Sequence, residues 1–311
     1  MEYLKTDEFK TVKEILEKEQ ISYTDIKRYM TGYCHQVYYV KEIKNEYVLR
    51  ISSPEVQEHY LGSLEWYPAL YDLGLPVPEI IYNGTHNEYS YTIMTYIKGK
   101  DLGEVYGLLS DNEKLQLAKD IVKIQKALSA ISSKGYYGCS IGEHYDSWAD
   151  VVLQSITRSK RRIVENGVFE EAYCDNVMAI LERFYDYLSS IGCIPFLDDI
   201  TTKNVMVHNG QLAGIVDLDG ICYGDSLFTV ALTNMALLNE DFDNKYIEYW
   251  LDEMQVTDIQ RKAVLFYTLV FCIDFMGEQG MSFPNGIKVY NEAKIHRLKK
   301  IYGNLIARLN E

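Results

Sequence analysis

A short segment built around Asn209-Gly210 constrains this chain more than any other feature of its sequence. Apolar runs flank the pair on both sides, and both residues tolerate the positive φ angles of a type I′ turn. The segment therefore predicts a β-hairpin with buried strands. Its register places Asn204 opposite Ile215, and Asp217, two residues further on, then points to the same side as Asn204.

Polar side chains at the open end of this hairpin predict a cation site. Diagonal neighbours of this kind lie about 7–8 Å apart at the backbone, close enough for their oxygens to meet on one ion. Buried polar groups need a partner, and Mg²⁺ takes one or two protein oxygens beside those of a nucleotide. We therefore predict that Asn204 and Asp217 hold Mg²⁺. Asp219 is a further metal candidate, which either binds a second ion or shapes the turn before Gly220.

A carboxylate just before the hairpin is the candidate catalytic group. Asp199 lies five residues before Asn204, on the loop that enters the first strand, and so near the same point. A carboxylate there can accept the proton of an attacking hydroxyl. The adjacent Asp198 is the alternative for this role.

The periodicity of the sequence changes near residues 97–100. Before this point the pattern is mostly that of strands, at 37–40, 47–51 and 89–96, with helices near 1–20 and 55–72. After it the pattern is mainly helical, and Ser110 with Glu113 forms a capping box. Helices are expected at 147–163, 169–190, 226–238, 258–276 and 287–309. We predict an N-terminal lobe over 1–97 and a helical C-terminal lobe over 98–311.

Composition excludes several classes of function. A net charge of −14 over 311 residues disfavours nucleic-acid binding and is compatible with a cationic substrate. The N-terminus does not look like a signal peptide, and no apolar run is long enough to span a bilayer, so we expect a cytoplasmic protein without a membrane partner. The six cysteines lack the spacing of a zinc site or a disulfide framework. They are interpreted as free thiols.

The order of Asp199, Asn204 and Asp217, followed by Gly224-Asp225 at the start of a helix, resembles the aminoglycoside phosphotransferase and choline kinase family. The resemblance implies an α+β, protein-kinase-like fold of two lobes, with a small antiparallel sheet in the first and mainly helices in the second. It also implies that Asp199 is the catalytic base or orients the substrate, and that Asn204 and Asp217 bind magnesium. Only Asp199 has the spacing to Asn204 that the family pattern requires.

The likeness extends upstream, where it implies the nucleotide-binding residues. A loop at Gly32 resembles the phosphate-covering loop, and Arg50 stands where the family usually has the phosphate-contacting Lys. The hinge that would meet adenine corresponds to Met94, Tyr96 and Ile97. The Glu expected on the first lobe's helix aligns with Ser63; Glu65 and Glu58 lie close to that position, and Glu65 is the candidate.

The predicted function is Mg²⁺-dependent transfer of the γ-phosphate of ATP or GTP to a hydroxyl of a small molecule. Aminoglycoside-, choline- and amino-alcohol-like acceptors all fit the resemblance, and either a monomer or a homodimer is compatible with it. The alternative is a catalytically impaired, pseudokinase-like nucleotide-binding protein. Leu197, in place of the family's usual His two residues before the catalytic Asp, and Ser63 favour that alternative.

Overall fold

The computed structural model describes residues 6–29, 35–282 and 289–311, and these fall into two compact units. The first unit comprises residues up to 98 together with 213–220, and the second comprises 99–212 together with residues from 221 onward. The first contains the larger sheet and the second most of the helices, which confirms the predicted α+β class. The segment 213–220, which follows the hairpin turn, belongs to the first unit. The sequence did not predict this return.

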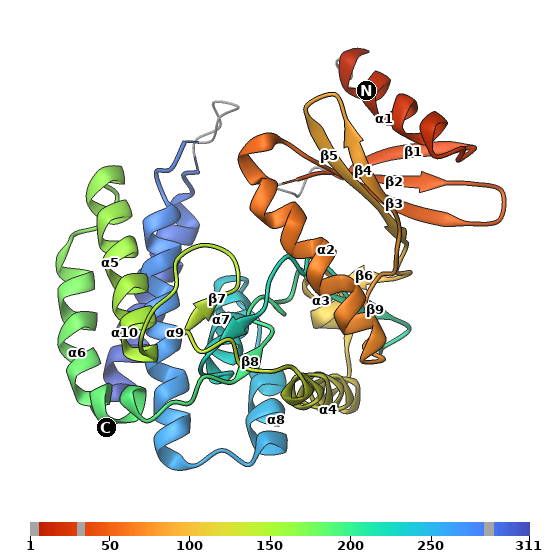
Figure 1. The fold of residues 1–311 in the computed structure, drawn as a ribbon. Coiled ribbons are helices and arrows are strands. Elements are labelled where there is room, and N and C mark those ends of the chain that lie inside the picture. The colour runs from red at the N-terminus through yellow and green to blue at the C-terminus, as the bar shows by residue number, and fades with distance from the viewer. Residues whose placement is uncertain (1–5, 30–34, 283–288) are drawn as a thin grey trace. The chain divides into compact units, whose positions relative to one another are not determined.

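The first unit is built on an antiparallel five-stranded sheet in the order β1-β2-β3-β5-β4 (Figure 1). The strands expected at 37–40 and 47–51 pair as a hairpin, with Val40 opposite Tyr47. The five strands are β1 (Asp25–Tyr29), β2 (His35–Lys41), β3 (Glu46–Ser52), β4 (Ile80–His86) and β5 (Tyr89–Thr95).

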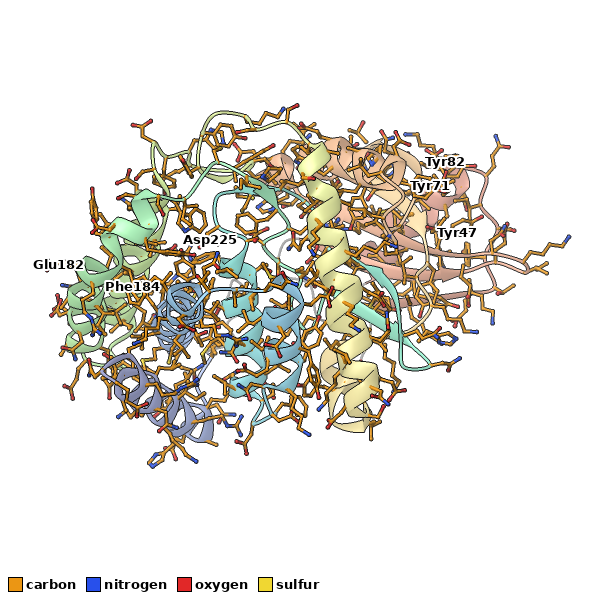
Figure 2. The ribbon with its side chains drawn as sticks, turned by 90° about the horizontal axis from the view of Figure 1, so that it is seen from below. Tyr47, Tyr71, Tyr82, Glu182, Phe184 and Asp225 are labelled. Atoms are coloured by element: carbon orange, nitrogen blue, oxygen red, sulfur yellow. The ribbon has the colours of Figure 1, made fainter. Side chains whose placement is uncertain are left out.

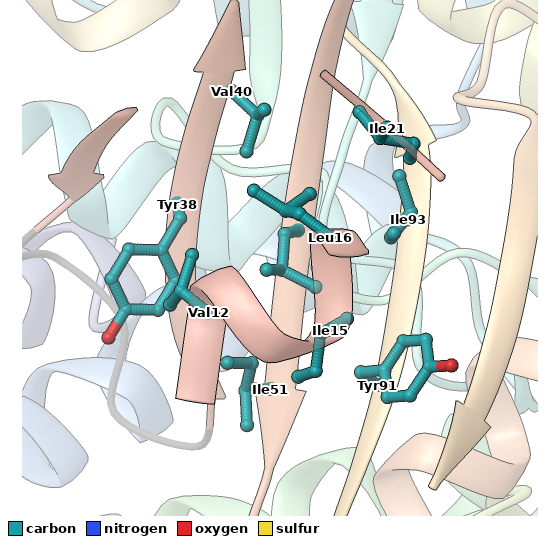
Figure 3. Packing of buried hydrophobic residues seen from close by; sticks show 10 residues of the cluster. Val12, Ile15, Leu16, Ile21, Tyr38, Val40, Ile51, Tyr91 and Ile93 are labelled. Carbon is teal, nitrogen blue, oxygen red and sulfur yellow. The ribbon is translucent and has the colours of Figure 1, made fainter. Parts of the chain in front are cut away.

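Helix α1 (Thr6–Lys18) packs on one face of this sheet, as Figure 3 shows. Val12, Ile15 and Leu16 follow the three- and four-residue spacing of one helix face and are fully buried. Burial of each such side chain contributes roughly 1.5–3 kcal/mol. Because side chains alternate along a strand, the residue between Leu49 and Ile51 faces away from α1. The strand side chains in this core are Tyr38, Val40, Leu49, Ile51, Tyr91 and Ile93.

A second helix and the returning segment complete the first unit. A 3₁₀ turn (Pro54–Val56) leads into α2 (Gln57–Asp72), which lies within the helix expected near 55–72, and Gly74, with φ of 75°, follows it. The returning segment is tied to the chain just after this point, because the Ile215 amide donates to the Pro76 carbonyl at 2.8 Å. At Gly214, any Cβ atom would lie 2.7 Å from the same carbonyl oxygen, so a side chain there would push the segment away.

The second unit is mainly helical, and α9 runs alongside α5, α7 and α10 (Figure 1). The capping box of Ser110 and Glu113 is confirmed at the start of α4. Two helices were not predicted, namely α3, which has only four residues, and α8, in which acidic side chains interrupt the buried ones. In the part of the chain that the structure describes, no helix is long and apolar enough to cross a membrane.

The helices of the second unit are α3 (Leu102–Val105), α4 (Asp111–Ala127), α5 (Trp148–Asn166), α6 (Ala172–Ser189), α7 (Leu227–Asn239), α8 (Lys245–Met254), α9 (Asp258–Glu278) and α10 (Glu292–Leu309), with 3₁₀ turns at Tyr106–Leu108 and Leu128–Ala130.

Two small sheets connect these helices. The first has the order β10-β9-β6, from β6 (Lys100–Asp101), β9 (Val205–His208) and β10 (Gln211–Ile215). Its turn has φ of 51° at Asn209 and 74° at Gly210, so the predicted hairpin turn is confirmed. The second has the order β7-β11-β8, from β7 (Gly138–Cys139), β8 (Pro195–Phe196) and β11 (Cys222–Tyr223).

Candidate active site

A buried cation on β3 organises the polar cluster of the first unit. Arg50 is only 5% exposed and lies on the face of the sheet opposite α1. Its Nη2 atom donates to both carboxylate oxygens of Asp219, at 2.8 and 3.0 Å, and to Oδ1 of Asp217 at 3.2 Å. The structure therefore brings three of the predicted site residues together within one unit.

Two histidines contact the same aspartate. His35 on β2 is buried, and its ring bridges Ser52 at 2.8 Å and Asp219 at 2.9 Å. His59 on α2 lies 3.5 Å from the Asp219 carboxylate. Burial would raise the pKa of Asp219, but the contacts with His35 and Arg50 outweigh it and lower this pKa below its usual value. Asp219 is therefore held as an anion, and neither histidine was predicted to serve this cluster.

The returning segment is fastened at its centre and exposes the neighbouring carboxylate. The amide of Leu218 donates to the hydroxyl of Tyr67 on α2 at 3.1 Å. Asp217 has a positive φ of 62° and a side chain that is 58% exposed, whereas the Asp219 side chain is 13% exposed. A positive φ at a residue other than Gly is uncommon and often marks a functional position. Asp217 is thus presented outward beside a buried, charged cluster.

The first-unit cluster fits both a phosphate group and a hard cation. Nη1 of Arg50 is buried and has no hydrogen-bond partner, and a buried donor of this kind calls for an acceptor. Arginine binds phosphate oxygens with a pair of parallel hydrogen bonds. Asp217 and Asp219 supply the carboxylate oxygens that Mg²⁺ prefers.

The predicted catalytic loop lies in the second unit and is ordered by its own side chains. The Asn204 side chain, whose residue is 8% exposed, donates through Nδ2 to the Asp199 carbonyl at 2.9 Å. The hydroxyl of Thr201 donates to the Asp199 carboxylate at 3.0 Å, and the Asn204 amide donates to the Thr201 carbonyl at 3.1 Å. Asp199 itself is exposed. Its carboxylate is oriented while it remains accessible.

The start of this loop is anchored by a residue that the sequence did not reveal. Gln125 on α4 donates to the Leu197 carbonyl at 2.8 Å and accepts from the Leu197 amide at 3.1 Å. Such a pair of bonds fixes the backbone irrespective of the side chain at that position. Leu197, which stands where the family usually has His, is therefore held through its backbone. In the sequence, Gln125 is a polar residue directly after the apolar Ile124, and this position alone does not indicate a contact with the loop.

Asp225 is a buried junction between helices (Figure 2). Its carboxylate accepts from the hydroxyls of Tyr187 at 2.7 Å and Tyr267 at 2.9 Å, and from the amide of Leu227 at 3.0 Å. Tyr267 in turn accepts from the Trp148 indole at 2.9 Å. Burial raises the pKa of Asp225. The Asp225 carboxylate therefore links the start of α7 to α6 and α9, and the links to α6 and α9 were not foreseen from the sequence.

Removal of this junction is expected to destabilise the protein. We expect Asp225→Ala to lower the free energy of unfolding by about 3 kcal/mol, because two hydroxyls and one amide lose their buried acceptor. Urea denaturation followed by circular dichroism measures this loss. Asp175→Ala, which removes an exposed carboxylate of α6 bound to Lys160, is the matched control and should change little. Equal losses in the two variants would contradict the role given to Asp225.

The remaining predicted nucleotide-binding residues are spread over the first unit. Met94 is buried in β5, and the Tyr96 amide donates to the Glu46 carbonyl at 3.2 Å, so this amide is already used. Ile97 is half-buried beside Gly214. Gly32 lies outside the described residues.

The Glu that the resemblance places on α2 aligns with a buried serine. Ser63 is buried and donates to the Tyr60 carbonyl at 2.7 Å, while Glu65 and Glu58 are exposed. Among the described residues, the ion-pair partners of Arg50 are the two aspartates of the returning segment.

Comparison with known proteins shows the family of this chain. The profile of the phosphotransferase enzyme family (APH) matches residues 25–261. The chain is similar to an aminoglycoside 3'-phosphotransferase of Niallia circulans, with 23% identity over 258 residues that cover 80% of this chain and 92% of that protein.

Solved structures share the fold. A thermostable mutant of aminoglycoside phosphotransferase APH(4)-Ia aligns with a TM-score of 0.68 and 16% identity, over 96% of this chain and 98% of that one; this enzyme has also been solved with AMP-PNP and hygromycin B. The ADP-bound aminoglycoside phosphotransferase APH(2'')-Ib aligns with a TM-score of 0.65 and 18% identity, over 96% and 97%. The kinase-like fold that the resemblance implied is therefore confirmed. The chain belongs to the phosphotransferase enzyme family and is a small-molecule kinase.

Proposed function

We propose that this protein transfers the γ-phosphate of ATP or GTP to a hydroxyl group of a small molecule in a Mg²⁺-dependent reaction. The observation that carries the proposal is the Arg50 cluster, in which a buried guanidinium with one unused donor is held by two carboxylates. Phosphoryl transfer requires cationic groups and metal ligands placed around the phosphates, and this cluster offers both kinds of group. Cytoplasmic ATP or GTP would supply the phosphate.

The proposed roles follow from the chemistry of each side chain. Nη1 of Arg50 binds a phosphate oxygen, and Asp217 together with the Asn204 amide oxygen supplies the metal ligands. Mg²⁺, when bound, neutralises the charge of the transferred phosphoryl group. The salt bridge to Arg50 and the hydrogen bond from His35 favour a positioning role for Asp219, which holds Arg50 in place. In the hinge, we assign the hydrogen bond to adenine to the Ile97 amide, because the Tyr96 amide already donates to the Glu46 carbonyl.

Asp199 is proposed to receive the proton of the acceptor hydroxyl. Its carboxylate is exposed, and the Thr201 hydroxyl fixes one of its oxygens. An exposed carboxylate can accept a hydrogen bond from a substrate hydroxyl. Holding the hydroxyl in line with the phosphate is most of what such an enzyme must do.

The acceptor is proposed to be a hydroxylated amine. Two observations support this class: the net charge of −14 and the relatives, whose names specify aminoglycosides. A screen of aminoglycosides, choline-like compounds and amino alcohols, with ADP or GDP release as the readout, tests it. Turnover with at least one class supports the proposal.

Thermal unfolding with ATP or GTP, with and without Mg²⁺, separates an active kinase from an impaired nucleotide-binding protein. Stabilisation that depends on Mg²⁺, with slow nucleotide hydrolysis, supports the kinase. Stabilisation without Mg²⁺, and without turnover on any acceptor, supports the pseudokinase-like alternative.

Substitution of Arg50 tests the phosphate contact. Arg50→Met is expected to weaken the binding of a non-hydrolysable ATP analogue by about 10–100-fold, because a charge-assisted hydrogen bond contributes roughly 1.5–3 kcal/mol. Arg50→Lys retains the charge without the planar guanidinium, so its affinity for the analogue should lie between those of the unchanged protein and Arg50→Met. Calorimetric titration gives the affinities. Lys27→Met, at an exposed cation of β1, is the control, and unchanged affinity in a folded Arg50→Met variant would refute the contact.

A further inference from the structure

Three short strands of the second unit bring two cysteines and one aspartate together. In the β7-β11-β8 sheet, Cys222 lies opposite Cys139 on one side and opposite Phe196 on the other. Opposed residues of antiparallel strands point to the same face. Asp198, two residues after Phe196, continues that row. The three segments are distant in sequence, so no ligand spacing could reveal the cluster.

The polar atoms of this cluster lie close to one another. The two Sγ atoms and a carboxylate oxygen of Asp198 are all within 4.8 Å of each other. Cys222 is buried, and Cys139 and Asp198 are half-buried. The half-buried members leave a route from solvent to the cluster.

The donor set suits a soft divalent cation rather than Mg²⁺. Zn–S bonds measure about 2.3 Å and Zn–O bonds about 2.0–2.2 Å in a tetrahedron, so the three ligand atoms would stand roughly 3.5–4 Å apart. The cluster would need to contract by no more than about 1 Å. Thiolates select zinc over the hard cations that carboxylates and water prefer.

We propose that Cys139, Asp198 and Cys222 form a binding site for one Zn²⁺ ion, with water as the fourth ligand. Binding converts each thiol to a thiolate, and two protons pass to solvent. The site is separate from the Mg²⁺ ligands assigned above, because none of its three residues belongs to that set.

The site is placed to act on the catalytic loop. Asp198 directly precedes Asp199, and the preceding Leu197 is already fixed by Gln125. Contraction of the cluster around a cation would therefore move the residue next to the proposed base. If Asp199 acts as proposed, such a displacement is expected to lower kcat by about 10-fold or more. This consequence rests on the proposed function, whereas the binding of zinc does not.

A metal titration of the full chain tests the proposal. The reduced protein, in a phosphine reductant without Mg²⁺, is titrated with Zn²⁺ against a chromogenic chelator, and with Co²⁺ while thiolate-to-cobalt absorption is recorded. We expect one Zn²⁺ per chain and a cobalt spectrum typical of tetrahedral sulfur ligation. Cys139→Ser and Cys222→Ala should each lose more affinity than the roughly 10–100-fold that loss of an outer-shell partner costs. Asp198→Asn should weaken binding without removing the sulfur absorption.

Controls separate this site from other thiols and from the active site. Cys193→Ser changes a half-buried cysteine that contacts the Tyr136 carbonyl instead, and it should bind Zn²⁺ as the unchanged protein does. Zinc inhibition of turnover should disappear in Cys139→Ser. Absence of zinc binding by the reduced protein, or binding that is equal in Cys139→Ser, Cys222→Ala and the unchanged chain, overturns the proposal. A disulfide between the two cysteines without metal binding by the thiols also overturns it. The binding outcomes do not depend on whether the chain phosphorylates a given acceptor, whereas the inhibition of turnover does.

Discussion

Replacement of Asp199 by asparagine is expected to lower kcat by about 10²–10⁴-fold, the range that a positioned base contributes. Asparagine keeps the size of the side chain and an oxygen that Thr201 can reach, so the loop should retain its shape. Nucleotide affinity should stay within about two-fold, because the lost interaction is made with the acceptor hydroxyl. Single-turnover rates with a saturating acceptor, together with calorimetric binding of ATP, measure the two effects separately.

The neighbouring carboxylate provides the control for this prediction. Asp198 is adjacent in sequence, but its carboxylate lies within 4.8 Å of the Cys222 thiol and burial raises its pKa. Asp198→Asn should therefore leave turnover within about ten-fold of that of the unchanged enzyme, in a buffer that contains Mg²⁺ and no Zn²⁺. The opposite pattern, with Asp199→Asn active and Asp198→Asn inactive, would transfer the role of base to Asp198. That outcome would leave the phosphotransferase family assignment intact.

The features that could be predicted from sequence are those that local chemistry decides. The residues on both sides of Asn209 and Gly210 favour strands, so the chain must turn at this pair. Both residues tolerate the positive φ angles that a tight turn needs, and both adopt them. Ser110 and Glu113 form the capping box through contacts three residues apart. Periodicity alone located most helices. These elements need no knowledge of which distant segments meet.

The features that could not be predicted depend on pairing between distant segments. The two-residue strands β7, β8 and β11 carry no periodic signal, yet their pairing places Cys139 against Cys222. Gln125 reaches the Leu197 backbone across 72 positions of sequence. Helix α8 was missed because it has only ten residues and charges interrupt its apolar ones, although Tyr246 and Trp250 are fully buried. Tertiary contacts decided each of these cases.

Arg50 shows how the structure changes the meaning of a sequence departure. In the sequence, Arg50 is a departure from the Lys that the family usually has at the phosphate site. In the structure one nitrogen of its fork serves Asp217 and Asp219 while the other lies buried without a partner. A lysine ammonium is a single point charge and cannot reproduce this division. The arginine, the two aspartates and His35 form one connected polar cluster.

Asp217→Asn is the second substitution with a large expected effect. Loss of one carboxylate ligand should lower kcat by at least about 100-fold, the effect of removing one group that stabilises transition-state charge, and should abolish the Mg²⁺ dependence of nucleotide binding. Asparagine is chosen because Asp217 has φ of 62°, which Asn tolerates as Asp does and Ala does not. Thermal unfolding with ATP at increasing Mg²⁺ concentrations, combined with turnover measurements, reads out both effects.

The interpretation of Asp217→Asn depends on a comparison with Asp219→Asn. Because Asp219 accepts from both Arg50 and His35 inside the first unit, its replacement should lower the stability of the protein as well as its turnover. Asp217 is mostly exposed, so Asp217→Asn should leave the unfolding temperature without ligand nearly unchanged. If Asp217→Asn retains stabilisation by ATP that rises with Mg²⁺ and Asp219→Asn loses it, the metal ligand is Asp219, and Asp217 then serves only to hold Arg50. If both variants retain it, the cation is bound elsewhere and the proposed site is wrong.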